Sequence, residues 1–162
     1  DYYQAIETNM ICYLDDKEYG RSILENSSFL ASSRNPDPRI HGQGFVARLS
    51  GSTAEMLSMW RYMFLGSKIF TYDNNELQFQ LSPKLPKHFF VDQKVSTTLF
   101  ESIKITYINP LMKNTYDDVE VQSYTLKRQG DVVTVVEGGR ICGKFAEKIR
   151  EKWIDEIEVI IQ

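Results

Sequence analysis

A glycine turn, a helix start and an apolar helix follow one another within residues 48–60, which read Arg48-Leu49-Ser50-Gly51-Ser52-Thr53-Ala54-Glu55-Met56-Leu57-Ser58-Met59-Trp60. Ser52 and Glu55 are three residues apart and match the capping box, in which each side chain accepts a hydrogen bond from the other residue's backbone N–H. This pattern predicts a helix over residues 53–65 that is closed by Gly66. Apolar side chains cover most of its circumference, which is typical of a helix inside a larger body.

The predicted helix start is also a candidate anion site. Ser50, Gly51, Ser52 and Thr53 offer backbone N–H groups and three hydroxyls, and helix N-termini of this kind bind phosphate readily. Arg48 would add a bidentate contact. The alternative is that these residues only cap the helix and satisfy its own unpaired N–H groups.

A long polar loop precedes this helix. Residues 31–47 collect most residue types that favour turns, and they include His41-Gly42-Gln43-Gly44. Long loops of this composition often carry binding residues. His41 and Gln43 are therefore candidates for a substrate or phosphate loop. The alternative is an ordinary surface connection.

After Gly66 the pattern changes to period two, and we place a domain boundary near Tyr72-Asp73-Asn74-Asn75. Alternating apolar and polar residues predict strands at 77–81, 103–108, 119–126, 132–136, 141–142 and 157–161. Residues 143–153 fit a short helix or an edge hairpin. Short strands separated by turn signals indicate an antiparallel sandwich or jelly roll over residues 73–162.

The composition narrows the function class. The chain has 162 residues, 42% of them hydrophobic, and a formal net charge of −3. These values exclude a disordered protein and give no electrostatic footprint for nucleic acid or an anionic membrane. Cys12 and Cys142 are isolated, which predicts reduced thiols in a cytoplasmic protein, although one long-range disulfide stays open. No zinc signature, nucleotide-binding motif or catalytic triad context is present.

The carboxylates offer no general acid either. Asp15, Asp16, Asp37, Asp117 and Asp118 stand in turn-like contexts, where Asp is expected for local hydrogen bonds. The chain begins at Asp1 without an initiator Met. Together with the apolar helix, this predicts a fragment of a longer polypeptide.

Three segments resemble one family of enzymes. Trp60 is one of the similar residues. The similar segments are Leu24-Glu25-Asn26-Ser27-Ser28-Phe29, then His41-Gly42-Gln43-Gly44-Phe45-Val46-Ala47-Arg48-Leu49-Ser50-Gly51-Ser52-Thr53-Ala54-Glu55, and Leu77-Gln78-Phe79-Gln80-Leu81-Ser82-Pro83-Lys84-Leu85-Pro86. This pattern resembles the C-terminal part of inverting glycoside phosphorylases related to cellobiose phosphorylase, and most closely the β-1,2-oligoglucan phosphorylase branch. The resemblance covers nearly the whole chain and is weaker beyond residue 110.

The resemblance implies a mixed α and β chain. Residues 1–72 would be the last segment of a helical (α/α)6 catalytic barrel with its phosphate-site loop, and residues 73–162 a jelly-roll-like β-sandwich. In that family a Thr/Ser-Gly pair before the last barrel helix binds inorganic phosphate, which maps onto Ser50 and Gly51. A phosphate-binding His also belongs to the pattern, with His41 as the candidate. The catalytic Asp of the family lies earlier in the barrel and has no counterpart here.

The expected function is therefore phosphorolysis of β-linked gluco-oligosaccharides in a complete enzyme, with the present chain inactive alone. Its partners would be an oligosaccharide, inorganic phosphate as a substrate and the rest of the barrel, with no metal or organic cofactor, no nucleic acid and no membrane; a homo-oligomer stays open. Two alternatives also stay open. One is a non-catalytic carbohydrate-binding β-sandwich, and the other is a structural domain that packs on a barrel or a partner.

Overall fold

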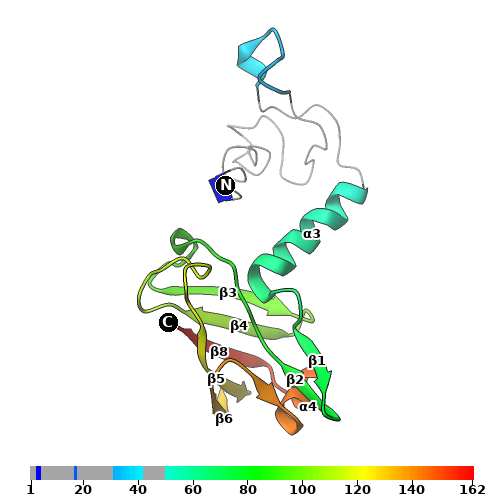
Figure 1. Ribbon diagram of the computed structural model, residues 1–162, viewed down its shortest axis with the longest axis vertical. Coiled ribbons are helices and arrows are strands. Elements are labelled where there is room, and N and C mark those ends of the chain that lie inside the picture. The colour runs from blue at the N-terminus through cyan, green and yellow to red at the C-terminus, as the bar shows by residue number, and fades with distance from the viewer. Residues whose placement is uncertain (1–2, 5–16, 18–30, 42–49) are drawn as a thin grey trace. The chain divides into compact units, whose positions relative to one another are not determined.

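A computed structural model describes residues 3–4, 17, 31–41 and 50–162 of the chain (Figure 1). The chain divides into two compact units, residues 1–59 and residues 60–162. The predicted residues Asp15, Asp16, Cys12, Gln43 and Arg48 lie outside the described part. Within the described part of the first unit, a 3-10 turn, η3, spans Pro38–Ile40.

The apolar helix α3 spans Ser50–Leu65 and crosses the division between the two units. It ends where the sequence predicts, because Gly66 adopts a φ of +89° and its N–H binds the carbonyl of Tyr62. The predicted start at Thr53 is wrong, since the helix begins at Ser50. Ser52 therefore lies inside the first turn and is not the N-cap. A glycine in a helix costs only about 1 kcal/mol relative to alanine, so Gly51 does not prevent this extension.

A five-stranded sheet forms the larger layer of the second unit. Its strands are β3 (Lys94–Leu99), β4 (Ile103–Ile108), β5 (Val121–Arg128), β6 (Asp131–Glu137) and β8 (Glu156–Ile161). Their order is β3-β4-β8-β5-β6, and Figure 1 shows β8 between β4 and β5. The predicted strands at β4, β5, β6 and β8 are thus confirmed to within a few residues.

The sheet is mixed, whereas the sequence predicted an antiparallel arrangement throughout. β4 and β8 pair in parallel, with Ile105 opposite Ile157, and the other pairs are antiparallel. The parallel pair arises because β8 enters the sheet after a helix instead of through a tight hairpin. That helix, α4, spans Lys144–Arg150, so the helical alternative for residues 143–153 holds.

A smaller sheet contains β1 (Phe70–Asp73), β2 (Glu76–Phe79) and β7 (Ile141–Cys142), in the order β1-β2-β7. The first two strands form a hairpin whose tip is Asn74-Asn75. Both residues have positive φ, as a type I′ turn requires. The stretch expected to mark a domain boundary is thus a hairpin turn within the second compact unit.

The core of the second unit is built from both sheets, from α4 and from the segment that follows β2. The fully buried side chains include Phe79, Leu85, Ile103, Ile105, Tyr107, Tyr124, Leu126, Ile141, Ile149, Ile154, Ile157 and Val159. α4 packs against β2 and β7 and contributes Ala146 and Ile149 to this core. The chain is therefore a mixed α and β protein, and no part of an (α/α)6 barrel is visible in the ranges described.

Candidate functional site

The candidate phosphate residues Ser50, Gly51 and Ser52 form the first turn of α3. Backbone N–H groups in the first turn of a helix have no partner within the helix, and the helix dipole favours an anion there. The side chains of these three residues lie outside the part of the chain that is described, as do Arg48 and Gln43. Their assignment to phosphate stays a prediction.

His41, the candidate of the preceding loop, is half-buried and ends η3. Its Nε2 lies 2.8 Å from the backbone oxygen of Asn35. A backbone carbonyl can only accept a hydrogen bond, so Nε2 of His41 is the donor to Asn35. The other ring nitrogen, Nδ1, is then left for a different contact. The bond holds His41 against its own loop.

Asp37 organises that same loop. Its Oδ1 accepts from the backbone N–H of Arg39 at 3.0 Å, and the Arg39 guanidinium contacts both carboxylate oxygens, with Nη2 to Oδ2 at 2.8 Å. The hydrogen bonds from Arg39 lower the pKa of Asp37. A general acid needs the opposite change, because it must keep its proton near neutral pH. Asp37 is therefore a structural carboxylate.

Asp117 also acts within a turn. Its Oδ2 accepts a hydrogen bond of 2.7 Å from Nδ2 of Asn114, and its backbone N–H binds the Asn114 carbonyl. Among the described residues, no three His, Cys, Asp or Glu side chains gather in a metal-binding arrangement. Cys142 is exposed and carries a free thiol.

The C-terminal end of α3 is fastened by hydrogen bonds at each of its last four carbonyls. Gly66 N–H donates to Tyr62 at 3.1 Å, Lys84 N–H to Met63 at 2.7 Å, and Ser82 N–H to Leu65 at 3.2 Å. The fourth bond comes from a side chain, since the Tyr107 hydroxyl donates to the Phe64 carbonyl at 2.5 Å. The last carbonyls of a helix otherwise lack partners. This end of the helix is thus an integral part of the second compact unit.

Tyr107 donates to the Phe64 carbonyl as a neutral phenol. The residue is fully buried. Burial raises its pKa well above the usual value, and the nearby Tyr124 adds to the effect. A neutral phenol retains the proton that the Phe64 carbonyl accepts.

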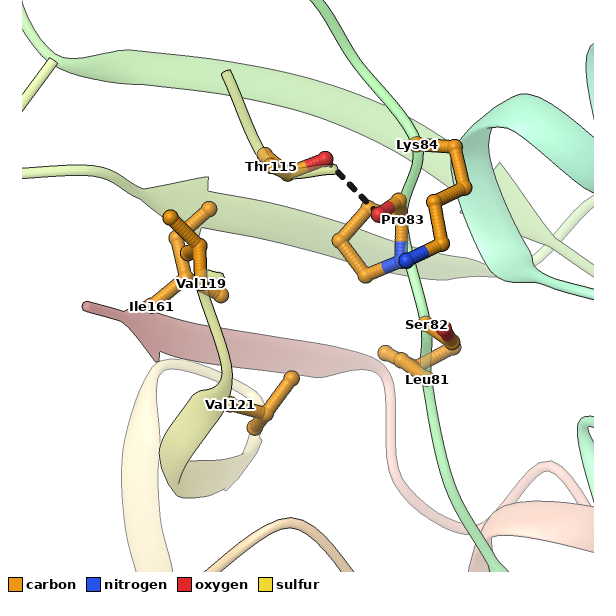
Figure 2. Close-up of a pocket in the computed structure, with 8 residues that line it drawn as sticks. All are labelled: Leu81, Ser82, Pro83, Lys84, Thr115, Val119, Val121 and Ile161. Atoms are coloured by element: carbon orange, nitrogen blue, oxygen red, sulfur yellow. Dashed lines mark hydrogen bonds between the residues drawn. The ribbon is translucent and has the colours of Figure 1, made fainter. Parts of the chain in front are cut away.

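A small cavity of about 50 Å³ lies beside the segment that binds the helix end (Figure 2). Its lining consists of Leu81, Ser82, Pro83, Lys84, Thr115, Val119, Val121 and Ile161. Thr115 lies across this segment, and its hydroxyl donates to the Pro83 carbonyl at 2.7 Å and accepts from Leu85 N–H at 2.7 Å. The space suits one or two water molecules and is too small for a sugar ring. Its role is structural.

The second unit also contains a larger open groove that sequence reasoning missed. It has a volume of about 390 Å³ and is lined by Phe70, Phe100, Arg150 and Lys152. These residues come from β1, the β3–β4 turn and the end of α4. No local sequence pattern indicates that these three segments meet, because neighbouring segments are at least thirty residues apart in the chain.

The five-stranded sheet bears on the alternative of a carbohydrate-binding module. Such modules present aromatic side chains in a row on an exposed face. The aromatic residues within the five strands are Tyr107 and Tyr124, and both are fully buried. The outer face instead carries polar pairs such as Lys127–Glu158, with Nζ to Oε1 at 2.8 Å.

No protein-family model matches this chain, and no curated protein or solved structure matches it. Among the described helices, none combines the length and the apolar character that a membrane crossing requires.

Proposed function

We propose that this chain is the C-terminal part of a cytoplasmic glycoside phosphorylase acting on β-linked gluco-oligosaccharides. In this proposal the helical part of the chain completes an (α/α)6 barrel, and the β-rich second unit supports the last barrel helix. The support comes from the resemblance described above and from one structural observation. The last four carbonyls of α3 all have partners, so the helix that begins with the candidate phosphate residues is fastened at its other end.

In this proposal the first turn of α3 binds inorganic phosphate. The backbone N–H groups of Ser50, Gly51 and Ser52 and the Ser50 hydroxyl hold the anion, Arg48 adds charge, and His41 and Gln43 line the approach of the substrates. The phosphate attacks the anomeric carbon while an Asp outside this chain protonates the leaving oxygen, which inverts the configuration. Inorganic phosphate is a substrate, and the reaction needs no metal or organic cofactor. The present chain is inactive alone.

A carbohydrate-binding β-sandwich is the second candidate, and a domain that only packs on a partner is the third. The buried positions of Tyr107 and Tyr124 leave the five-stranded sheet without an aromatic row, which argues against sugar binding on that face. The hydrogen-bonded end of α3 fits the phosphorylase and the packing domain equally well. These two candidates differ in whether the full-length protein has an activity that depends on phosphate.

The test is made in the full-length polypeptide that contains this chain. Ser50→Ala removes a hydroxyl from the phosphate, and Gly51→Val obstructs close approach of the anion to the backbone. Losing one hydrogen bond to a charged group corresponds to a tenfold to hundredfold rise in the phosphate KM. Ser58→Ala is the matched control, because Ser58 is an exposed serine two turns further along the same helix.

The measurement is the release of glucose 1-phosphate from β-linked gluco-oligosaccharides at varied phosphate. We expect the full-length protein to release it and residues 1–162 alone to release none. We expect Ser50→Ala and Gly51→Val to raise the phosphate KM while Ser58→Ala leaves it unchanged. A full-length protein without phosphorolytic activity, or variants that lose stability with an unchanged phosphate KM, would contradict the proposal.

A further inference from the structure

The groove between β1, the β3–β4 turn and the end of α4 combines two aromatic faces with two cations. The rings of Phe70 and Phe100 are nearly parallel, with centroids 5.9 Å apart and an interplanar angle of 14°. The guanidinium of Arg150 lies 5.9 Å from the Phe70 centroid, and Lys152 Nζ lies 5.8 Å from the Phe100 centroid. All four residues belong to the second compact unit.

The aromatic floor of the groove is held by the core. Phe70 packs on the fully buried Phe79 at 5.1 Å between centroids, and Phe79 packs edge-on against Tyr124 at 6.0 Å. Tyr124 is itself fixed, because its hydroxyl accepts from Leu81 N–H and donates to the Gly139 carbonyl. A ring platform anchored in this way loses little conformational entropy when a ligand binds.

Phe100 lies at a turn position whose backbone conformation is unusual for an aromatic residue. Phe100 and Glu101 form the tip of the β3–β4 hairpin with φ of +54° and +60°. Other tight turns among the described residues place Asn74-Asn75, Asp92-Gln93 and Gln129-Gly130 at positive φ. Asn and Gly accept positive φ easily, whereas a bulky aromatic residue does not. Strained positions of this kind cluster at ligand sites.

The two cations are not neutralised by protein carboxylates. Throughout the part of the chain that the structure describes, Arg150 and Lys152 form no ion pair, and their charged ends contact only the faces of Phe70 and Phe100. Both distances are near the outer limit of about 6 Å for a cation–π contact, so these contacts are weak. The cations can therefore turn toward an anion in the groove without breaking a stronger interaction.

We propose that this groove binds a small anionic ligand that carries a ring with an apolar face. The ring stacks on Phe100 and Phe70, and the phosphate or carboxylate group of the ligand is held between Arg150 and Lys152. Phosphorylated sugars and aryl phosphates share this chemistry. The groove volume lies within the usual range for small-molecule sites. The site is separate from the first turn of α3 and does not depend on the function proposed above.

The test is a titration of residues 1–162 with phenyl phosphate, followed by backbone amide shifts in NMR spectra. We expect saturable shifts at residues 100–102 and 150–152, with a Kd on the order of 1 mM for a ligand of this size. Inorganic phosphate and benzyl alcohol supply the charge and the ring separately, and each should bind at least about tenfold more weakly there. Glucose 1-phosphate in a parallel titration shows whether a sugar ring replaces the aryl ring.

Three variants identify the groups that bind. Arg150→Gln and Lys152→Gln each remove one surface charge and should weaken phenyl phosphate binding about fivefold to tenfold. Phe100→Asn removes the ring but suits the turn, so the variant should stay folded and lose the binding. Arg128→Gln is the matched control, because Arg128 also lies over an aromatic ring, that of Trp153 at 4.1 Å, outside the groove. Its binding should equal that of the wild type.

Two results would overturn the proposal. One is that neither phenyl phosphate nor glucose 1-phosphate shifts the amides around the groove. The other is that the Arg150 and Lys152 variants bind as tightly as the Arg128 control.

Discussion

Replacing Thr115 by Val should destabilise the second compact unit far more than its conservative chemistry suggests. The side chains have nearly the same shape, so the change removes a hydroxyl and leaves packing almost intact. That hydroxyl bridges two backbone groups of the segment after β2. It donates to the Pro83 carbonyl at 2.7 Å (Figure 2), and it accepts from Leu85 N–H at 2.7 Å. Thr115 is 2% exposed, and Leu85 is fully buried and does not line the small cavity beside Pro83, so the Leu85 N–H has no bulk water to replace the lost partner.

The magnitude follows from these groups. A buried N–H left without a partner costs about 1–3 kcal/mol, and the Pro83 carbonyl loses a further bond of about 1 kcal/mol. The extra apolar methyl of Val offsets roughly 1 kcal/mol. The free energy of unfolding should therefore fall by about 1–3 kcal/mol. For a unit of this size, at roughly 4–5 °C per kcal/mol, that corresponds to a decrease in Tm of about 4–15 °C.

The assay is urea denaturation of residues 1–162 followed by tryptophan fluorescence. Both tryptophans, Trp60 and Trp153, belong to the second unit, so the signal reports on that unit. Thr115→Ser keeps the hydroxyl and should cost only about 1 kcal/mol for the lost methyl. Thr98→Val, at an exposed position on β3, should stay within about 0.5 kcal/mol of the wild type. The reasoning is refuted if Thr115→Val is no less stable than Thr98→Val.

Three further predictions concern the same unit. Tyr107→Phe should lower the free energy of unfolding by about 1–2 kcal/mol in the same urea assay, because the Phe64 carbonyl loses its partner; an unchanged midpoint would contradict this. Burial raises the pKa of Tyr124 to about 12, above the ordinary value of 10 that it regains on unfolding, so stability should fall as pH rises from about 10 to 12, by about 2–3 kcal/mol. Tyr124→Phe should reduce that pH dependence, and equal slopes in both proteins would exclude Tyr124 as its source. Gly143→Ala should cost about 1–3 kcal/mol in thermal unfolding, since Gly143 has a φ of +58° and an added Cβ would lie 2.5 Å from the Glu76 carboxylate; a Tm within 2 °C of the wild type would argue against strain there.

The strands that the sequence predicts well are those with a clear inward and outward face. Along β8, Ile157, Val159 and Ile161 are buried while the residues between them are half-buried. Along β4, Ile103, Ile105 and Tyr107 are fully buried while Lys104 is exposed. Period-two patterns arise because successive side chains on a strand point to opposite sides of the sheet. Such strands are visible in the sequence without knowledge of their neighbours.

Two strands, β1 and β3, escaped prediction. β1 has four residues and no fully buried side chain. β3 lies at the edge of its sheet, and its inward positions include the polar Thr97 between Val95 and Leu99. An edge strand buries less surface, so selection for apolar residues at its inward positions is weaker. Pairing with β4 decides its conformation.

The candidate phosphate site and the groove differ in how far the chain alone reveals them. Ser50, Gly51 and Ser52 are adjacent in sequence, so a local pattern pointed to the start of a helix, although the first helical residue was misplaced. Local sequence rules place the end of a helix only approximately. A residue with a modestly unfavourable helix propensity can still be helical when packing stabilises the helix as a whole. No local rule relates Phe70, Phe100 and Arg150.

The sequence by itself determined the mixed α and β class, the end of α3 at Gly66 and the positions of most strands, because each depends on side-chain periodicity and turn chemistry within a few residues. Only the tertiary structure decided that β8 lies between β4 and β5 and runs parallel to β4. It also decided that carbonyls at the end of α3 accept hydrogen bonds from Tyr107, Ser82 and Lys84. Finally, it brought two cations and two phenyl rings together in one groove. These features depend on contacts between residues far apart in the chain. Their free energy is gained only when the whole unit excludes water from a shared core.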